Sequence, residues 1–285
     1  MKNEQIQSIV AIPQIRQFLN RYNLSANFVE ENIIEFLTWK EEIIKCNGCR
    51  SLSFCRQKLK GKVYHLGFDE NGYLEERYIS CSFEKKKEEM LAHRKNFKIS
   101  HMSEMDYLIE IENLTKKIDL KSEYLKTLQA VIQSERDPKG LYLYGQAGVG
   151  KSYMMKALCN YYAKAGKTVS FVKVPLWVKT MKESFGQEEI AQRMNRALLK
   201  SDVVIFDDIG SESISAWTLN ELLFPILDER MEKKKKTYFT SNYSMEELQQ
   251  KYAFIEKSDK VGADRVMERI RTLANGTLLS GSSLR

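Results

Sequence analysis

The chain has no run of about 18 apolar residues, the length that a helix needs to cross the interior of a membrane. Its first residues, Met1 to Gln5, are polar and lack the apolar core of a secretory signal peptide. These absences predict a cytoplasmic protein that does not contact a membrane. A net charge of +7 permits contact with nucleic acid but does not demonstrate it.

Cysteine is also scarce, and its distribution is uneven. The chain has five cysteines, and four of them lie in its first third. So few cysteines in a cytosolic protein argue against a disulfide framework, so the cluster needs another explanation. Cys46 and Cys49 form a C-x-x-C pair with Gly48 in its turn, and His65 and Cys81 follow, each after fifteen intervening residues.

Three thiolates and one imidazole at these spacings are typical of a structural zinc site. Residues 62–68 and 73–80 are β-prone and flank the turn-forming residues 69–72, which predicts a hairpin between the ligands. The predicted zinc ligands are Cys46, Cys49, His65 and Cys81. Cys55 competes for the fourth position, and free thiols are the alternative. A redox pair is disfavoured because no thioredoxin-like pattern surrounds the two cysteines.

A length of 285 residues suits two domains. Residues 5–45 carry apolar side chains at helical spacing, and residues 84–98 form a charge-dense connector. We place the boundary near residue 100. A small helical and zinc-binding domain, residues 1–100, is then expected to precede a second domain at residues 101–285.

The second domain contains the pattern G-x-x-x-x-G-K-[ST]. Its residues are Gly145, Gln146, Ala147, Gly148, Val149, Gly150, Lys151 and Ser152. A β-prone run precedes the pattern and a helical pattern follows it, which is the setting of a phosphate-binding loop. Glycines let backbone N–H groups face phosphate oxygens, lysine adds charge near the β- and γ-phosphates, and serine binds Mg²⁺. A chance match in an ordinary turn is the alternative.

Four further strands are predicted, at residues 168–174, 202–208, 236–242 and 277–280. The second of these strands has four apolar residues before Asp207 and Asp208. Asp207 would hold Mg²⁺, and Asp208 stands where a base would lie that activates the water attacking a bound phosphate. Asn242, at the end of the next strand, would bond that water or the γ-phosphate. Strands that alternate with helices predict an α/β domain with a central parallel sheet, covered on both faces. Each motif alone is also compatible with an ordinary strand or turn.

Residues 265–271 form a basic helix, which is either a solvated helix face or the carrier of an arginine finger for a neighbouring subunit. Together with the preceding motifs, this helix resembles the AAA+ ATPases over roughly residues 103–285. The residues that carry the resemblance are 145–152, 203–208, 240–242 and 267–270. The narrower resemblance is to the bacterial helicase-loader branch, on residues 206–212, Trp217, residues 228–231 and the Cys/His domain in front.

The resemblance implies roles for the matching positions. Lys151 and Ser152 would serve the phosphates of ATP and ADP and Mg²⁺, and Asp207 would serve Mg²⁺. Asn242 matches the sensor 1 position, and Arg269 matches the arginine finger, which implies an ATP-dependent oligomer. The N-terminal domain would dock on the hexameric replicative helicase. The second domain would contact single-stranded DNA weakly, alongside other primosome proteins, while the ring is placed on DNA in replication initiation or restart.

Two features depart from the general AAA+ pattern. Asp208 stands where many members carry glutamate, and no convincing second arginine sensor follows Arg271. Both features predict a slow Mg-dependent ATPase that acts as a switch, with an active site completed by a neighbouring subunit. An ATPase helper for DNA transposition is an alternative, against which the zinc-bearing domain argues. An adaptor that binds nucleotide without hydrolysing it is another.

Overall fold

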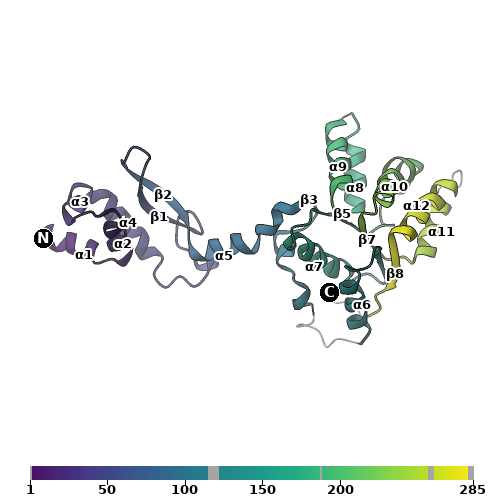
Figure 1. Ribbon diagram of the computed structural model, residues 1–285, viewed down its shortest axis with the longest axis horizontal. Helices are drawn as coiled ribbons and strands as arrows, with labels where there is room; N and C mark the ends of the chain where they lie inside the picture. Colours follow the sequence, from purple (N-terminus) through teal and green to yellow (C-terminus); the bar gives the residue numbers. More distant parts are fainter. Residues whose placement is uncertain (1, 115–121, 187, 256–259, 282–285) are drawn as a thin grey trace. The chain divides into compact units, whose positions relative to one another are not determined.

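A computed structural model describes residues 2–114, 122–186, 188–255 and 260–281 (Figure 1). The chain divides into two compact units, residues 1–90 and 91–285, and each has its own hydrophobic core. No helix within the described ranges is long and apolar enough to span a membrane.

The N-terminal unit begins with helices, as the apolar spacing of residues 5–45 predicts. They are α1 (Lys2–Val10), α2 (Pro13–Tyr22), α3 (Ala26–Glu31) and α4 (Ile33–Lys45). Pro13 begins α2, where its missing N–H costs no helical hydrogen bond. Asn23 ends the same helix in the left-handed conformation, with φ at 52°. The helices pack around Phe36 and Trp39, which are fully buried.

A two-stranded antiparallel hairpin completes this core, as the sequence predicts. It consists of β1 (Lys62–Phe68) and β2 (Leu74–Ser80). Asp69 closes its turn, because Oδ1 accepts hydrogen bonds from the backbone N–H groups two and four residues later, at 2.9 and 2.7 Å. Tyr64 and Leu66 alternate along β1 and point into the cluster formed by the helices.

The segment expected as a connector, residues 84–98, is divided between the two units. It begins in α5 (Ser82–Met90) and ends in β3 (Phe97–Ser100). Strand β3 pairs with β5 (Val169–Lys173) in the sheet of the C-terminal unit. The observed division at residue 90 therefore precedes the expected boundary near residue 100, because the connector already contains a strand of the second core.

The C-terminal unit is built on a six-stranded sheet in the order β3-β5-β6-β7-β4-β8, with all neighbours parallel. Its remaining strands are β4 (Gly140–Tyr144), β6 (Val203–Asp207), β7 (Lys236–Ser241) and β8 (Ala274–Leu278). The predicted strands are confirmed, although the last one begins at Ala274 rather than Thr277. Strand β3 was not predicted.

Helices cover both faces of this sheet (Figure 1). They are α6 (Ser122–Gln133), α7 (Lys151–Lys164), α8 (Val174–Glu183), α9 (Glu188–Lys200), α10 (Phe224–Glu232), α11 (Met245–Ile255) and α12 (Lys260–Leu273). Val203 and Ile205 of β6 face the layer of α6 and α7, and Val204 and Phe206 face the layer of α8 to α12. The unit is thus an α/β domain with a central parallel sheet that helices cover on both faces.

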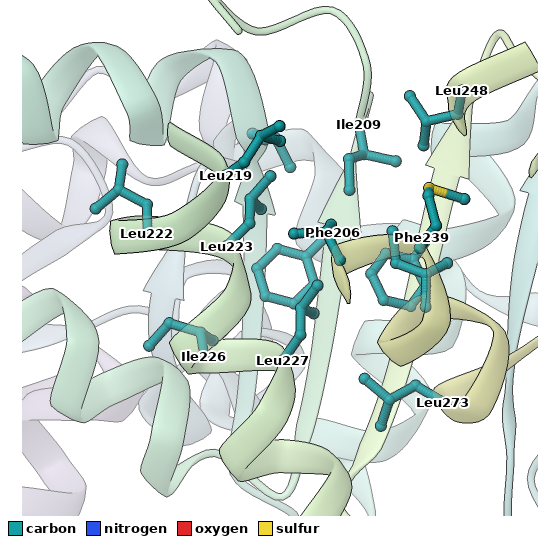
Figure 2. Close-up of a cluster of buried hydrophobic side chains, with 14 of the residues drawn as sticks. Phe206, Ile209, Leu219, Leu222, Leu223, Ile226, Leu227, Phe239, Leu248 and Leu273 are labelled. Carbon is teal, nitrogen blue, oxygen red and sulfur yellow. The ribbon is translucent and has the colours of Figure 1, made fainter. Parts of the chain in front are cut away.

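Figure 2 shows the core of the second layer. The rings of Phe206 and Phe239 stack with centroids 5.6 Å apart, so the carboxyl ends of β6 and β7 are held together by packing as well as by backbone hydrogen bonds. Leu227 of α10 and Leu248 of α11 belong to the same cluster (Figure 2). Trp177 is also fully buried in it.

Arg230 of α10 is fully buried and lies at the opposite end of β7. Its guanidinium donates to Oγ1 of Thr237 at 3.0 Å and to the carbonyl of Lys236 at 2.7 Å, both on β7. It also donates to the carbonyls of Leu198 and Ser201 at the end of α9, at 2.6 and 3.0 Å. The negative end of the α9 dipole thereby compensates a buried charge.

Candidate nucleotide-binding site

The predicted phosphate-binding loop connects β4 to α7. Gly145, Gly148 and Gly150 all have positive φ, at 148°, 87° and 101°. A Cβ on Gly145 would stand 2.2 Å from the carbonyl oxygen of Leu279, so no other residue fits there. Gly150 precedes the first turn of α7, so the positive end of the helix dipole lies at the loop. The backbone therefore has the geometry of an anion cradle.

Lys151 is the first residue of α7, and its side chain folds back over the loop. Its ammonium donates to the carbonyls of Gly145 and Gln146, at 2.6 and 2.8 Å. It also donates to Oδ1 of Asn242 at 2.9 Å. The side chain is largely buried, so the structure places a positive charge in a restricted space between the loop and the end of β7.

The other loop residues differ in their exposure. Gln146 and Ala147 are exposed at the tip of the loop. Val149 is buried and packs with the apolar residues beneath α7. The loop is thus anchored by one apolar side chain, while its tip is open to solvent.

Asp207 ends β6 beside the loop and is almost completely buried. Its carboxylate is hydrogen-bonded to the hydroxyl of Ser152, and Oδ1 accepts from Oγ1 of Thr240 at 2.7 Å. Burial raises the pKa of Asp207, the two hydroxyl bonds oppose that rise, and the charge of Asp208 adds to it. A carboxylate and a hydroxyl are hard oxygen ligands of the kind Mg²⁺ prefers, so Ser152 and Asp207 fit a magnesium ion.

Asp208 follows in an unusual backbone conformation, with φ at 61°. Its N–H donates to Oγ1 of Thr240 at 2.9 Å. Its Oδ1 accepts from Oγ of Ser211 at 2.9 Å and from Nδ2 of Asn242 at 3.4 Å. Asn242 therefore contacts both the loop lysine and the second acid, and the predicted motifs converge at the carboxyl ends of neighbouring strands, as the sequence indicates.

The segment after Asp208 is fixed by a buried carboxylate. Oε2 of Glu212 accepts from the N–H of Gly210 at 2.6 Å, and Oε1 accepts from the hydroxyl of Tyr252 on α11 at 2.7 Å. Burial raises the pKa of Glu212. A Cβ on Gly210, where φ is 94°, would stand 2.7 Å from Cδ1 of Leu248. The backbone turn that presents Asp208 is thus closely packed against α11.

Sequence reasoning missed two supporting residues, Thr240 and Tyr252. Thr240 belongs to a recognised motif, but no role followed from its type. The contact with Asp207 depends on the pairing of β6 with β7, which aligns Phe206 with Phe239. Nothing in the sequence indicated a role for Tyr252, because its partner Glu212 is forty residues away in the chain.

Arg269, the predicted arginine finger, lies on α12 away from these contacts. Its Nε donates to Oδ1 of Asp228 on α10 at 2.8 Å, and its Nη1 donates to Oε2 of Glu268 at 2.6 Å. The guanidinium carbon lies 5.1 Å from the centroid of the Phe224 ring. Within one chain, the structure does not bring Arg269 into contact with the loop lysine or the two acids.

The structure does not support the predicted zinc site. Nowhere in the described parts of the chain do three or more His, Cys, Asp or Glu side chains form a group that could hold a metal ion. The ring of His65 instead lies 4.9 Å from that of Trp39 and 6.4 Å from that of Phe18, as part of the aromatic core. Burial lowers the pKa of His65.

Each of the four cysteine sulfurs has a different polar neighbour in the structure. Cys46 accepts from Nε2 of Gln57 at 3.2 Å, and Cys49 lies 3.5 Å from the carbonyl of Ser51. Cys55 and Cys81 accept backbone N–H groups, from Gly61 at 3.4 Å and Glu84 at 3.5 Å.

The other two histidines contact polar groups of the C-terminal unit. His93 is buried in the C-terminal unit, with Nε2 3.3 Å from Oδ1 of Asn160. Nδ1 of His101 accepts from the N–H of Lys173 at 3.1 Å. Both side chains fasten the segment around β3 to the sheet and to α7.

Known proteins resemble both units of the chain. The replicative helicase loader DnaI of Bacillus subtilis strain 168 is 27% identical over 277 residues, which cover 93% of this chain and 86% of that protein. A crystal structure of DnaI is 29% identical with a TM-score of 0.57, and the match covers 65% of this chain and 98% of that one. The crystal structure of a putative primosome component from Streptococcus pyogenes serotype M3 is 31% identical with a TM-score of 0.54, over 68% and 98%.

The family model of IstB-like ATP-binding proteins matches residues 73–285, well over half of the chain. This range contains every residue of the phosphate-binding loop and both acids of β6 and its turn. The chain therefore belongs to the family of IstB-like ATP-binding proteins.

Proposed function

We propose that this protein is an ATP-dependent loader of the hexameric replicative DNA helicase, which places the ring on single-stranded DNA in replication initiation or restart. The observation that carries this proposal is the extent of the match to the DnaI helicase loader. A match over 93% of the chain cannot fit within residues 73–285, so it reaches into the N-terminal unit. The likeness therefore includes a part of the chain that the ATP-binding family model does not describe.

The site supports Mg-dependent ATP binding and slow hydrolysis. The loop backbone and Lys151 would hold the phosphates, and Ser152 and Asp207 would hold Mg²⁺, which supplies charge neutralisation at the β- and γ-phosphates. Asp208 would orient the attacking water and accept its proton, and Asn242 would fix that water or the γ-phosphate. Because aspartate is shorter than glutamate, Asp208 reaches less far toward the water. We therefore expect turnover well below the roughly 10 per second of a typical enzyme.

Arg269 would complete this site in a neighbouring subunit of an ATP-dependent oligomer. Its contacts within the chain support that role, because Asp228 holds the guanidinium by Nε, on an outer helix and away from the chain's own phosphate-binding loop. Such an arginine stabilises charge that develops on the transferred phosphoryl group.

The two units would divide the work of the loader. We assign helicase docking to the N-terminal unit and ATP-dependent, weak contact with single-stranded DNA to the C-terminal unit, in the cytoplasm and with other primosome proteins. An aromatic pair, of which Phe185 is exposed and Trp217 is partly buried, supports the DNA contact. Phe185 and Trp217 have ring centroids 5.0 Å apart, and Phe185 is 67% exposed. Exposed aromatic rings suit the stacking of unpaired bases.

Complex formation tests this proposal. The full chain and the replicative helicase of the same organism are mixed, separated by size exclusion and measured by light scattering, with ATP and without it. A complex of defined stoichiometry is expected, and its absence in both conditions would overturn the loader assignment.

A transposition helper is the second candidate, because the matching family is named for insertion-sequence proteins of the IstB type. It requires binding to a transposase rather than to the helicase, so the same measurement separates the two. A nucleotide-binding adaptor without hydrolysis is the third, and it requires that ATP stays intact in the complex.

A further inference from the structure

Thr240 lies between the two acids of the candidate site and touches both. It is the next-to-last residue of β7 and is 1% exposed. Its Oγ1 donates to Oδ1 of Asp207 at 2.7 Å and accepts the N–H of Asp208 at 2.9 Å. A hydroxyl has one proton and two lone pairs, so it can make both bonds at once.

The backbone around Asp208 gives this contact its importance. Asp208 has φ at 61°, in the left-handed region that residues with a side chain adopt uncommonly, although aspartate does so more readily than most. Contacts around its backbone help to fix this conformation. Thr240 supplies two of these contacts, since its carbonyl also accepts the N–H of Ile209 at 2.9 Å. The conformation turns the Asp208 carboxylate toward Asn242.

We propose that Thr240 is a positioning residue, whose hydroxyl orients the Mg-binding carboxylate of Asp207 and the backbone that presents Asp208, so that metal binding and water activation depend on one side chain. This inference rests on the proposed ATP hydrolysis. Thr240 itself would contact neither the nucleotide nor the attacking water.

Thr237 provides a matched control on the same strand. It is also fully buried, and its Oγ1 accepts from Nε of Arg230 at 3.0 Å and donates to the carbonyl of Lys235 at 2.9 Å. Its bonds therefore resemble those of Thr240 in number and burial, but they lie at the opposite end of β7. Loss of either hydroxyl is expected to destabilise the fold, and only loss at Thr240 is expected to change the metal requirement.

The experiment compares the full-length wild type with Thr240→Val, Thr240→Ser and Thr237→Val. Thermal unfolding checks the fold, fluorescent ATP measures nucleotide binding across a range of Mg²⁺ concentrations, and phosphate release measures hydrolysis. Thr240→Val is expected to lower kcat and to raise the Mg²⁺ concentration needed for half-maximal binding, each by about 10- to 100-fold. Thr240→Ser retains the hydroxyl and is expected to restore both values to near wild type.

Other outcomes have definite meanings. Wild-type kcat and Mg²⁺ requirement in a folded Thr240→Val protein would overturn the inference, as would equal losses in Thr237→Val. If Thr240→Val does not fold, Thr240→Ser decides the question. A folded Thr240→Ser protein that lacks the wild-type kcat and Mg²⁺ requirement would then overturn the inference. If the wild type binds Mg-ATP without hydrolysing it, the proposed ATPase fails, and the shift in Mg²⁺ requirement alone decides the role of Thr240.

Discussion

The ammonium of Lys151 lies 2.9 Å from Oδ1 of Asn242, so the phosphate-binding loop and the end of β7 are in direct contact. Nδ2 of the same amide faces Oδ1 of Asp208 at 3.4 Å. One side chain thereby connects the group that would hold the phosphates with the group that would hold the attacking water. This connection predicts that binding and hydrolysis respond differently to substitutions.

Asn242→Ala should lower kcat for ATP hydrolysis by about 10- to 100-fold and leave nucleotide affinity nearly unchanged, because the amide orients groups without carrying charge. Lys151→Ala should instead weaken nucleotide binding itself, since it removes the positive charge beside the phosphates. Fluorescent ATP binding and phosphate release, measured on the same samples, separate the two effects. Hydrolysis at the wild-type rate by Asn242→Ala would contradict the assignment.

Asp207→Asn should stabilise the protein in the absence of Mg²⁺ and abolish Mg-dependent hydrolysis. Burial raises the pKa of this carboxyl in the folded state. The stability that its protonated form contributes is therefore complete below the ordinary aspartate pKa of about 4 and is lost as pH rises through the raised value. Asparagine stays neutral and can still accept from Thr240, so it avoids that loss.

Thermal unfolding between pH 4 and pH 8 without magnesium checks this prediction. The melting temperature of Asp207→Asn should exceed that of the wild type by an amount that grows with pH, by about 2 to 4 °C for each kcal/mol. Added Mg²⁺ should stabilise the wild type alone. A difference that does not vary with pH would show that ionisation of Asp207 is not its cause.

Arg269→Ala should retain ATP binding and lose hydrolysis if the arginine completes a neighbouring site. Mixing it with Lys151→Ala then provides a direct test, because a Lys151→Ala subunit can supply Arg269 to a subunit that still binds ATP. Hydrolysis should recover in the mixture, whereas each variant alone is inactive.

Arg265→Ala is the matched control for this experiment. It removes an arginine from the same helix, whose guanidinium carbon lies 3.7 Å from the centroid of the Phe224 ring. It should leave hydrolysis near the wild-type rate. Failure of the mixture to recover would mean that Arg269 does not act between subunits.

Much of the C-terminal unit follows from local patterns in the sequence. The loop from Gly145 to Ser152 requires glycine at positions where φ is positive, so its residue types reveal its backbone. Apolar runs that end in polar residues locate β6 and β7 and the carboxyl ends where Asp207 and Asn242 lie. Parallel strands bring such ends together, so the convergence was predictable from strand order along the chain.

The contacts that the sequence did not predict depend on packing between segments that are far apart in the chain. The imidazole of His65 is of a type that binds zinc. However, His65 lies on β1, which packs against helices rich in aromatic residues, and its ring lies against that of Trp39. Strand β3 is short and lies in a charge-dense stretch, so no sequence pattern indicated that it would pair with β5. The bridge from Thr240 to both acids requires the register between β6 and β7, which a single sequence does not specify.

Loading of the helicase onto closed circular single-stranded DNA is the direct test of the proposed loader function. A closed circle has no end to thread, so a helicase ring reaches it only if the ring is opened or assembled around it. With the wild-type chain and ATP, helicase should co-purify with the circles, and with Lys151→Ala it should not. Equal amounts of helicase on the circles with and without this protein would show that it does not load the helicase.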